Sequence, residues 1–244
     1  MRWRGIAAVF AAVALAGCTA TATGVAHRTR ATSPVALRAT QSARPVTSAK
    51  PEPKPKSKPK PDGALPIAPP DAARLPQTRA FPSTTDTAFK NAIHDFWLAV
   101  TTGNANYAEQ AFFPEKAYEQ VKAISDPAYD WRTRLWYEFT LDVAAVHPLI
   151  GRNARLLRVI VPAEYAIWIP PGACYNSIGY WHVPGSRVVY EQDGVTRSFG
   201  ITSFISWRGD WYLVHLGALS RPAPVGIVDD PQSGPGVPGP PGGC

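Results

Sequence analysis

The feature that most constrains the fold of this chain is a change in hydrophobic periodicity near residue 150. Before it, apolar residues recur every three or four positions, which is the period of an amphipathic helix. After it, short runs of β-branched and aromatic residues alternate with turn signals, as in an antiparallel meander. Helices followed by such strands predict an α+β fold, with N-terminal helices packed on a curved antiparallel β-sheet, and exclude a βαβ arrangement.

The expected helices and turns have identifiable ends. The first helix is expected between a cap at Thr84 or Thr85 and Gly103, and the longest helix begins at Trp131. In the sheet, Asp193-Gly194 predicts a two-residue hairpin turn of type I′.

A second tight turn is expected at Gly209-Asp210, just after the long strand over residues 195–207. Gly200 lies within that strand and predicts a bulge or bend there.

Proline and positive charge are concentrated ahead of the predicted helices. The stretch Lys50–Pro61 alternates proline with lysine, which favours polyproline II and blocks helix and sheet. Residues 1–79 carry 13 Lys/Arg against 3 Asp/Glu, whereas residues 80–228 carry 12 against 13. Because the folded part has no basic excess, a nucleic-acid partner is not expected. The predicted organisation is a tether over 19–80, a domain over 81–221 and a Gly/Pro-rich tail over 222–244.

The N-terminus carries an export signal. Met1–Arg4 is positively charged, and the apolar run Ile6–Leu15 is too short to span a bilayer. The sequence Leu15-Ala16-Gly17-Cys18 that ends this run resembles a bacterial lipoprotein signal peptide over residues 1–18. The resemblance implies a lipid on Cys18, which becomes the first residue of a chain anchored at the extracytoplasmic face of the membrane. An ordinary secretory signal cut near residue 20 or 22 is the alternative.

Two further cysteines remain, Cys174 and Cys244. An exported compartment permits disulfides, and a free thiol on a Gly/Pro-rich tail would be reactive. We therefore expect a Cys174–Cys244 disulfide, and a pair of free thiols is the alternative. The segment before Cys244, residues 234–243, has no apolar face to pack.

The residues of the predicted strands indicate a resemblance to known proteins. Gly179-Tyr180-Trp181-His182, Ile205-Ser206-Trp207-Arg208-Gly209 and the segment Trp211–Gly217 follow the predicted helices. This order of helices and strands is similar to that of the cone-shaped NTF2-like (cystatin-like) superfamily. The sequences of the strands resemble those of a group of actinobacterial secreted proteins and lipoproteins. The resemblance implies an NTF2-like cone over roughly residues 84–219. It implies no activity, because that fold carries enzymes and binding modules alike.

Catalytic motifs are scarce. The chain has no phosphate loop, GxGxxG, HExxH, CxxC or GxSxG, and no two histidines are three or four residues apart, so neither a metal nor a cofactor is expected. His215 lies within the last long strand, where it could act as acid or base with Asp95 or Asp142. The alternative is a core histidine bonded to Ser203 or to a backbone carbonyl. The adjacent His94 and Asp95 are expected on different faces of their helix.

Aromatic side chains offer a second kind of site. Tyr175, Tyr180, Trp181 and His182, in or beside the Cys174 loop, are candidates for the rim of a ligand site. The alternative is that the aromatic residues fill the core beneath a curved sheet.

Together these features predict a membrane-anchored, non-catalytic lipoprotein that binds a small apolar ligand or an envelope protein. One alternative is a small enzyme of the ketosteroid-isomerase or SnoaL-like kind that uses His215 and a helix carboxylate. A second alternative is a cell-wall polymer binder that works through the basic tether. A homodimer is compatible with either class of function.

Overall fold

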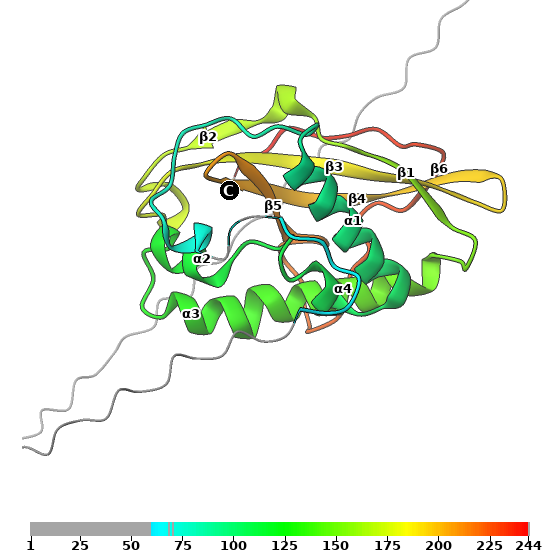
Figure 1. Ribbon diagram of the computed structural model, residues 1–244, viewed down its shortest axis with the longest axis horizontal. Helices are drawn as coiled ribbons and strands as arrows, with labels where there is room; N and C mark the ends of the chain where they lie inside the picture. The colour runs from blue at the N-terminus through cyan, green and yellow to red at the C-terminus, as the bar shows by residue number, and fades with distance from the viewer. Residues whose placement is uncertain (1–59, 68, 70, 244) are drawn as a thin grey trace, which may run out of the picture. The chain divides into compact units, whose positions relative to one another are not determined.

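Residues 60–67, 69 and 71–243 are described by a computed structural model of the chain, and they belong to a unit that begins at Lys56. Within this unit a layer of helices covers one side of a six-stranded antiparallel sheet (Figure 1). The expected α+β fold is confirmed. Cys18, Cys244 and the tether over 19–59 lie outside the described residues, so the expectations placed on them stay predictions.

Helix α1 spans Thr87–Thr102 and is capped at both ends. The Asp86 carboxylate accepts the Phe89 amide at 2.8 Å, so Asp86 is the N-cap, and our choice of Thr84 or Thr85 was wrong. Gly103 has φ of 70°, the left-handed conformation that ends a helix at low cost for glycine, as predicted.

The remaining helical residues form a short helix and one long, interrupted helix. Helix α2 spans Glu115–Val121, and the long helix comprises α3 over Pro127–Asp130, a π-helical turn over Trp131–Leu135 and α4 over Trp136–Val146. It begins four residues before the predicted Trp131, because Asp126 caps the first turn by accepting the Tyr129 amide. Short 3₁₀ turns cover Ala72–Arg74, Ala105–Ala108, His147–Leu149, Ala163–Tyr165 and Ala173–Tyr175.

The sheet is built around one long hairpin. Strands β3 (Tyr180–Gln192) and β4 (Val195–Trp207) form its centre, and the order is β1-β3-β4-β5, with β2 also paired to β3 and β6 to β4. The outer strands are β1 (Arg155–Ile160), β2 (Ile167–Ile169), β5 (Asp210–His215) and β6 (Gln232–Ser233). Every strand pair is antiparallel.

The hairpin turns follow from backbone conformation. Asp193 and Gly194 have φ of 53° and 75°, as a type I′ turn requires, so this prediction is confirmed. In the second turn Arg208 and Gly209 carry the positive φ values, and Asp210 already pairs with Trp207. The predicted Gly209-Asp210 turn is therefore wrong by one residue.

Gly200 is not a bulge, contrary to our prediction. It pairs with Arg187 in the regular register of β3 and β4. Its amide donates to the Asp229 carbonyl at 2.7 Å, and a Cβ on Gly200 would lie 2.0 Å from the Asp229 carboxylate. The glycine permits close approach of another segment, as glycine does elsewhere in strands.

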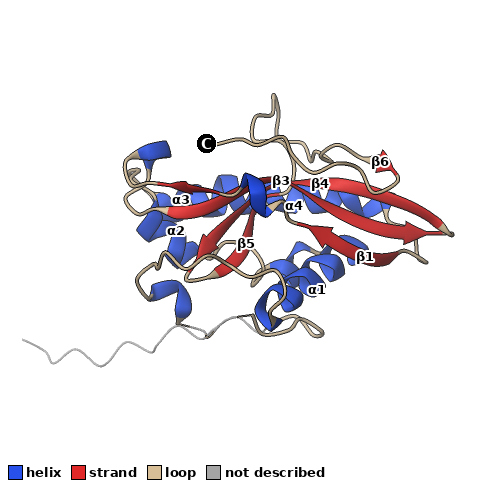
Figure 2. Ribbon diagram, turned by 90° about the horizontal axis from the view of Figure 1, so that it is seen from above, coloured by secondary structure: helices blue, strands red, loops and turns tan. Residues whose placement is uncertain are grey.

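Figure 2 shows the strands from above, with helices visible behind them. Aromatic rings join the helices to the sheet. The ring of Phe96 on α1 lies 6.4 Å from that of Phe199 on β4, and Phe112 lies 4.7 Å from Phe139 on α4. All four side chains are almost fully buried. Burying each such ring contributes roughly 1.5–3 kcal/mol to folding.

The folded unit extends further toward the N-terminus than residue 81. The Leu65 amide donates to the Asp95 carboxylate on α1, and Ile67 is buried in the core. The Gln77 side chain donates to the Ser206 carbonyl and accepts the Arg208 amide, both at the β4–β5 hairpin. Leu65, Ile67 and Gln77, which the sequence assigned to the tether, thus contact the domain.

The Gly/Pro-rich segment after residue 221 also contacts the domain. Residues 221–227 lie against α4, and residues 229–239 cross the sheet on the side opposite α3 and α4 (Figure 1). The Asp230 carboxylate accepts Arg187 at 2.7 Å, and the Gly239 amide donates to Gly185 at 2.8 Å. These contacts are backbone hydrogen bonds and an ion pair with one buried arginine, so this segment is held on the domain without an apolar face.

Candidate functional site

Three polar residues line one face of the sheet. Ser203 on β4 pairs with His215 on β5, and His182 lies on the same face of β3, since it pairs with Ile205 two residues along β4. His182 Nε2 and Ser203 Oγ share a hydrogen bond of 2.7 Å. The sequence offered Ser203 as a partner of His215, and the structure gives this partner to His182.

Both histidines are held in the neutral form. Burial lowers the pKa of His182 to about 4. Burial lowers the pKa of His215 to about 3, with additional lowering by the positive charges of Arg134 and Arg221. At neutral pH these imidazoles can donate and accept hydrogen bonds, but they carry no charge.

The Asp95 carboxylate already has hydrogen-bond partners within the fold. Its side chain is fully buried, and it accepts the Leu65 amide through both carboxylate oxygens at 2.8 and 3.1 Å. His94 Nδ1 lies 3.0 Å from the same carboxylate, so the expectation that these neighbours point apart was wrong. The pair joins residues 60–67 to α1 and makes no hydrogen bond with His215.

Asp142 is occupied in a similar way. It is 2% exposed and accepts the amides of Gly217 and Ile227 at 2.9 and 2.8 Å. Its oxygens also accept both terminal nitrogens of Arg221, at 2.8 and 3.1 Å. Asp142 therefore links α4 to the segment that follows β5, and it too makes no hydrogen bond with His215.

The four rim candidates do not form one surface. Tyr180 and His182 are buried and share a sheet face, whereas Trp181 lies on the opposite face. Trp181 makes an edge contact with Phe81, with ring centroids 5.1 Å apart. Tyr175 is 78% exposed and packs against neither group.

The Cys174 loop is fixed by α2. Lys122 Nζ donates to the Cys174 carbonyl at 3.1 Å, and the Ala123 amide donates to Tyr175. Cys244 lies outside the described residues, so the proposed Cys174–Cys244 bridge stays a prediction. The last described residue, Gly243, lies beside Ile167 of β2, a strand that precedes this loop.

Arg134, Asp130 and Tyr118 form a hydrogen-bonded cluster between the long helix and α2. Arg134, on the π-helical turn, donates to Asp130 at 2.6 Å and to the Tyr118 hydroxyl at 3.0 Å. Burial and the Asp130 carboxylate raise the pKa of Tyr118 well above its usual value. A π-helical turn within an α-helix is frequent at functional sites, and here it carries the arginine whose positive charge helps to lower the pKa of His215.

Beside this cluster is a surface cavity of about 350 Å³ between the long helix and residues 221–224. The Arg221 side chain is 6% exposed, and its Nε has no hydrogen-bond partner within the described part of the chain. Glu138 Oε2 is likewise buried and unpartnered there, and Arg221 Nε lies 4.0 Å from Glu138 Oε1. The lining residues are Thr133, Arg134, Tyr137, Glu138, Arg221, Pro222, Ala223 and Pro224.

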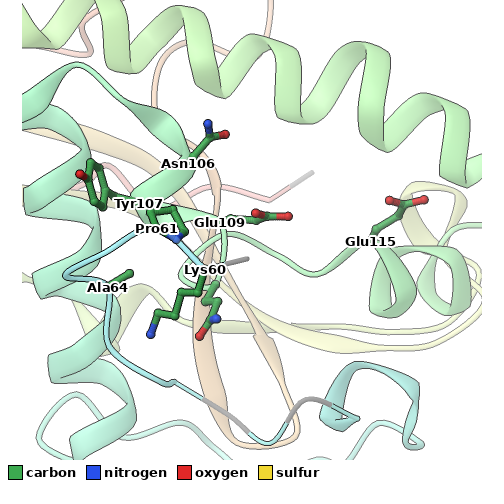
Figure 3. A pocket seen from close by; sticks show the side chains of 8 residues that line it. Lys60, Pro61, Ala64, Asn106, Tyr107, Glu109 and Glu115 are labelled. Atoms are coloured by element: carbon green, nitrogen blue, oxygen red, sulfur yellow. The ribbon is translucent and has the colours of Figure 1, made fainter. Parts of the chain in front are cut away.

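A second cavity, of about 370 Å³, is less suited to binding (Figure 3). Its charged side chains do not converge, since Lys60 and Glu115 point away from one another in Figure 3. Glu115 is engaged by Arg132 at 2.6 Å. The lining residues are Lys60, Pro61, Ala64, Asn106, Tyr107, Glu109, Gln110 and Glu115, and none has a buried unpartnered side-chain atom.

Sequence reasoning missed Glu138 and Arg221 as site residues. Glu138 is one of several charged residues on a helix, and Arg221 lies in a proline-rich segment that showed no periodicity. Only the fold brings them together, across 83 positions of sequence. The sole local signal was the rigid Arg221-Pro222-Ala223-Pro224 sequence.

Comparison with protein-family models, with curated proteins and with solved structures finds no match to this chain. Among residues 60–67, 69 and 71–243, no group of three or more His, Cys, Asp or Glu side chains is placed to hold a metal ion. Within the same described residues, no helix has the length and apolar character needed to cross a membrane.

Proposed function

We propose that this chain is a lipid-anchored extracytoplasmic binding protein with an NTF2-like domain. The Leu15–Cys18 sequence supports the anchor and the location. Helices packed on an antiparallel sheet support the fold resemblance, and the Pro/Lys tract supports a tether between membrane and domain.

The observation that carries the binding role is the unpartnered pair in the cavity beside α4. Buried polar atoms in native proteins are nearly always hydrogen-bonded, because an unpaired one costs about 1–3 kcal/mol. Arg221 Nε is such a donor, and Glu138 Oε2 is such an acceptor, in one cavity wall. Because both atoms are shielded from the cavity, a ligand would hydrogen-bond them, and so recover this cost, only after the Arg221 and Glu138 side chains turn toward it.

The same geometry gives less support to the two alternatives. An acid–base enzyme would need a carboxylate near His215, and both Asp95 and Asp142 are engaged by backbone amides. A wall-polymer binder that works through the tether would leave the cavity pair unexplained.

Native mass spectrometry tests the proposal on the full chain extracted in mild detergent from the membranes of its own cells. A lipid-modified chain starting at Cys18, with an additional mass that dissociates on activation, is the expected result. A chain without lipid in the soluble fraction would refute the anchor. A lipidated chain with no ligand, in extracts prepared without washing, would refute the binding role. A mass of twice the chain would identify a homodimer.

A further inference from the structure

We infer that a patch of aromatic and basic side chains on the sheet docks on the headgroup region of an anionic membrane. The patch is formed by residues of β2, β3, the β4–β5 turn and the segment before α1: Arg79, Phe81, Trp168, Trp181 and Arg208. The inference rests on the proposed function only for the lipid that would keep the domain beside a membrane, and it goes beyond the binding role assigned to the cavity.

The first step is the geometry of the aromatic side chains. Trp168 on β2 pairs with Trp181 on β3, and their ring centroids lie 5.5 Å apart. The Phe81 ring makes edge contacts with Trp181 at 5.1 Å and with Trp211 on β5 at 5.9 Å. Trp181 Nε1 donates to the Arg79 carbonyl at 3.2 Å. The rings therefore form one continuous cluster, and residues 79–81 are held against it.

The second step is exposure. Phe81 is 50% exposed although its ring contacts two tryptophans, and Trp168 and Trp181 are only partly buried. Single exposed apolar side chains are ordinary, but a contiguous group of them marks an interaction surface. Contact with a partner would remove this apolar area from water, which favours docking.

The third step is charge. The Arg79 guanidinium lies over the Trp168 ring, 4.8 Å from its centroid. Arg208 donates to the Pro76 carbonyl, which holds it beside the same segment. No ion pair within the described part of the chain includes Arg79 or Arg208, and residues 72–85 contain no acidic residue. The two guanidinium charges are thus left without a carboxylate partner, and they favour an anionic surface.

The fourth step is the class of partner. Tryptophan rings concentrate where lipid headgroups meet the acyl chains, and arginine bonds phosphate groups through two nitrogens. Arginines beside exposed aromatic rings match both parts of that interface. Residues 19–59 would link a lipidated Cys18 to the domain, so the patch would stay at a high effective concentration next to the membrane. A small patch that binds free vesicles only weakly is then sufficient for docking.

Fluorescence quenching by brominated lipids tests this inference on the full chain extracted from its own cells. The chain is reconstituted into vesicles of phosphatidylcholine alone or of equal parts phosphatidylcholine and phosphatidylglycerol. Bromine on the acyl chains quenches only those tryptophans that contact the lipid. The variants Phe81→Ala and Arg79→Gln alter the patch, and Tyr129→Ala and Arg155→Gln alter exposed residues of the same kinds elsewhere.

Quenching is expected in the mixed vesicles and not in phosphatidylcholine alone, and added salt should reverse it. Arg79→Gln should lower the docking equilibrium constant about fivefold and Phe81→Ala about tenfold. Both control variants should match the wild type.

Other results would overturn the inference. No quenching in the mixed vesicles would leave the patch to a protein partner, and equal quenching in both kinds of vesicle would remove the role of charge. Equal quenching in all four variants would place the lipid contact elsewhere. A chain without lipid on Cys18 would refute the proposed anchor alone, because the same mixed vesicles, titrated into the soluble chain, should still quench it. A soluble chain that no mixed vesicle quenches would overturn this inference as well.

Discussion

Two histidines with lowered pKa values make the stability of this domain depend on pH. The pKa values of His182 and His215 lie near 4 and 3 in the folded state, whereas a histidine in an unfolded chain titrates near about 6.5. Between these limits the unfolded chain binds more protons than the folded chain. The free energy of unfolding therefore falls as the pH is lowered through this window.

The size of the effect follows from the interval over which only the unfolded state is protonated. At pH 5 an unfolded imidazole is almost fully protonated, and each folded imidazole is still neutral. Relative to pH 7, this difference in protonation lowers the free energy of unfolding by about 2 kcal/mol for each histidine and by about 4 kcal/mol for both. Burial raises the carboxyl pKa of Asp210 and Asp229, so these groups oppose the loss as the pH falls.

The measurement is urea unfolding of the wild type and of His215→Asn at pH 7 and pH 5. Because Asp210 and Asp229 are present in both proteins, the difference between their pH-dependent losses isolates the histidine. The variant should lose about 2 kcal/mol less than the wild type between the two pH values. His182→Gln should behave in the same way. Identical losses in the wild type and both variants would refute the conclusion that these imidazoles are buried in the neutral form.

Three further predictions concern the segment after β5. Asp142→Asn leaves the Arg221 charge without its buried partner and should lower the free energy of urea unfolding by about 3 kcal/mol. Glu191→Gln, in an exposed ion pair, should lower it by less than about 1 kcal/mol. Equal losses would contradict a stabilising buried Asp142–Arg221 pair. Gly226→Ala places a Cβ 2.0 Å from the Leu141 carbonyl oxygen and should speed hydrogen exchange of the backbone amides of residues 221–230. Gly242→Ala, whose Cβ would have its nearest neighbour 3.9 Å away, should leave that exchange unchanged. Unchanged exchange in both variants would show that Gly226 does not pack tightly on α4. The intact mass of the non-reduced protein should be two hydrogens below that of the reduced protein, and Cys174→Ser should abolish this difference if the bridge joins Cys174 to Cys244.

Local signals predicted the parts of the fold that depend on local chemistry. The Asp193-Gly194 turn could be predicted because few residues adopt two successive positive φ values. The end of α1 at Gly103 follows from the same preference. The cap was misplaced because Thr84, Thr85 and Asp86 all suit that position, and only the backbone geometry selects among them.

Long-range contacts were the part that the sequence could not supply. Asp95 and Asp142 read as catalytic candidates because carboxylates near a strand histidine suggest acid–base chemistry, yet their partners are amides 30 or more residues away. Likewise, nothing local indicates that Asp229 and Asp230 cross β4 and β3. Segments without periodicity can still be ordered by backbone hydrogen bonds, which leave no hydrophobic pattern to detect.

The crossing of the sheet by residues 229–239 also has a consequence for the order of folding. A chain synthesised from its N-terminal end contains β3 and β4 before the residues that cover them. Until Asp230 arrives, Arg187, which is 2% exposed in the folded domain, lacks its ion-pair partner. We therefore expect the sheet to consolidate only after residues 229–239 have been synthesised and can cross it.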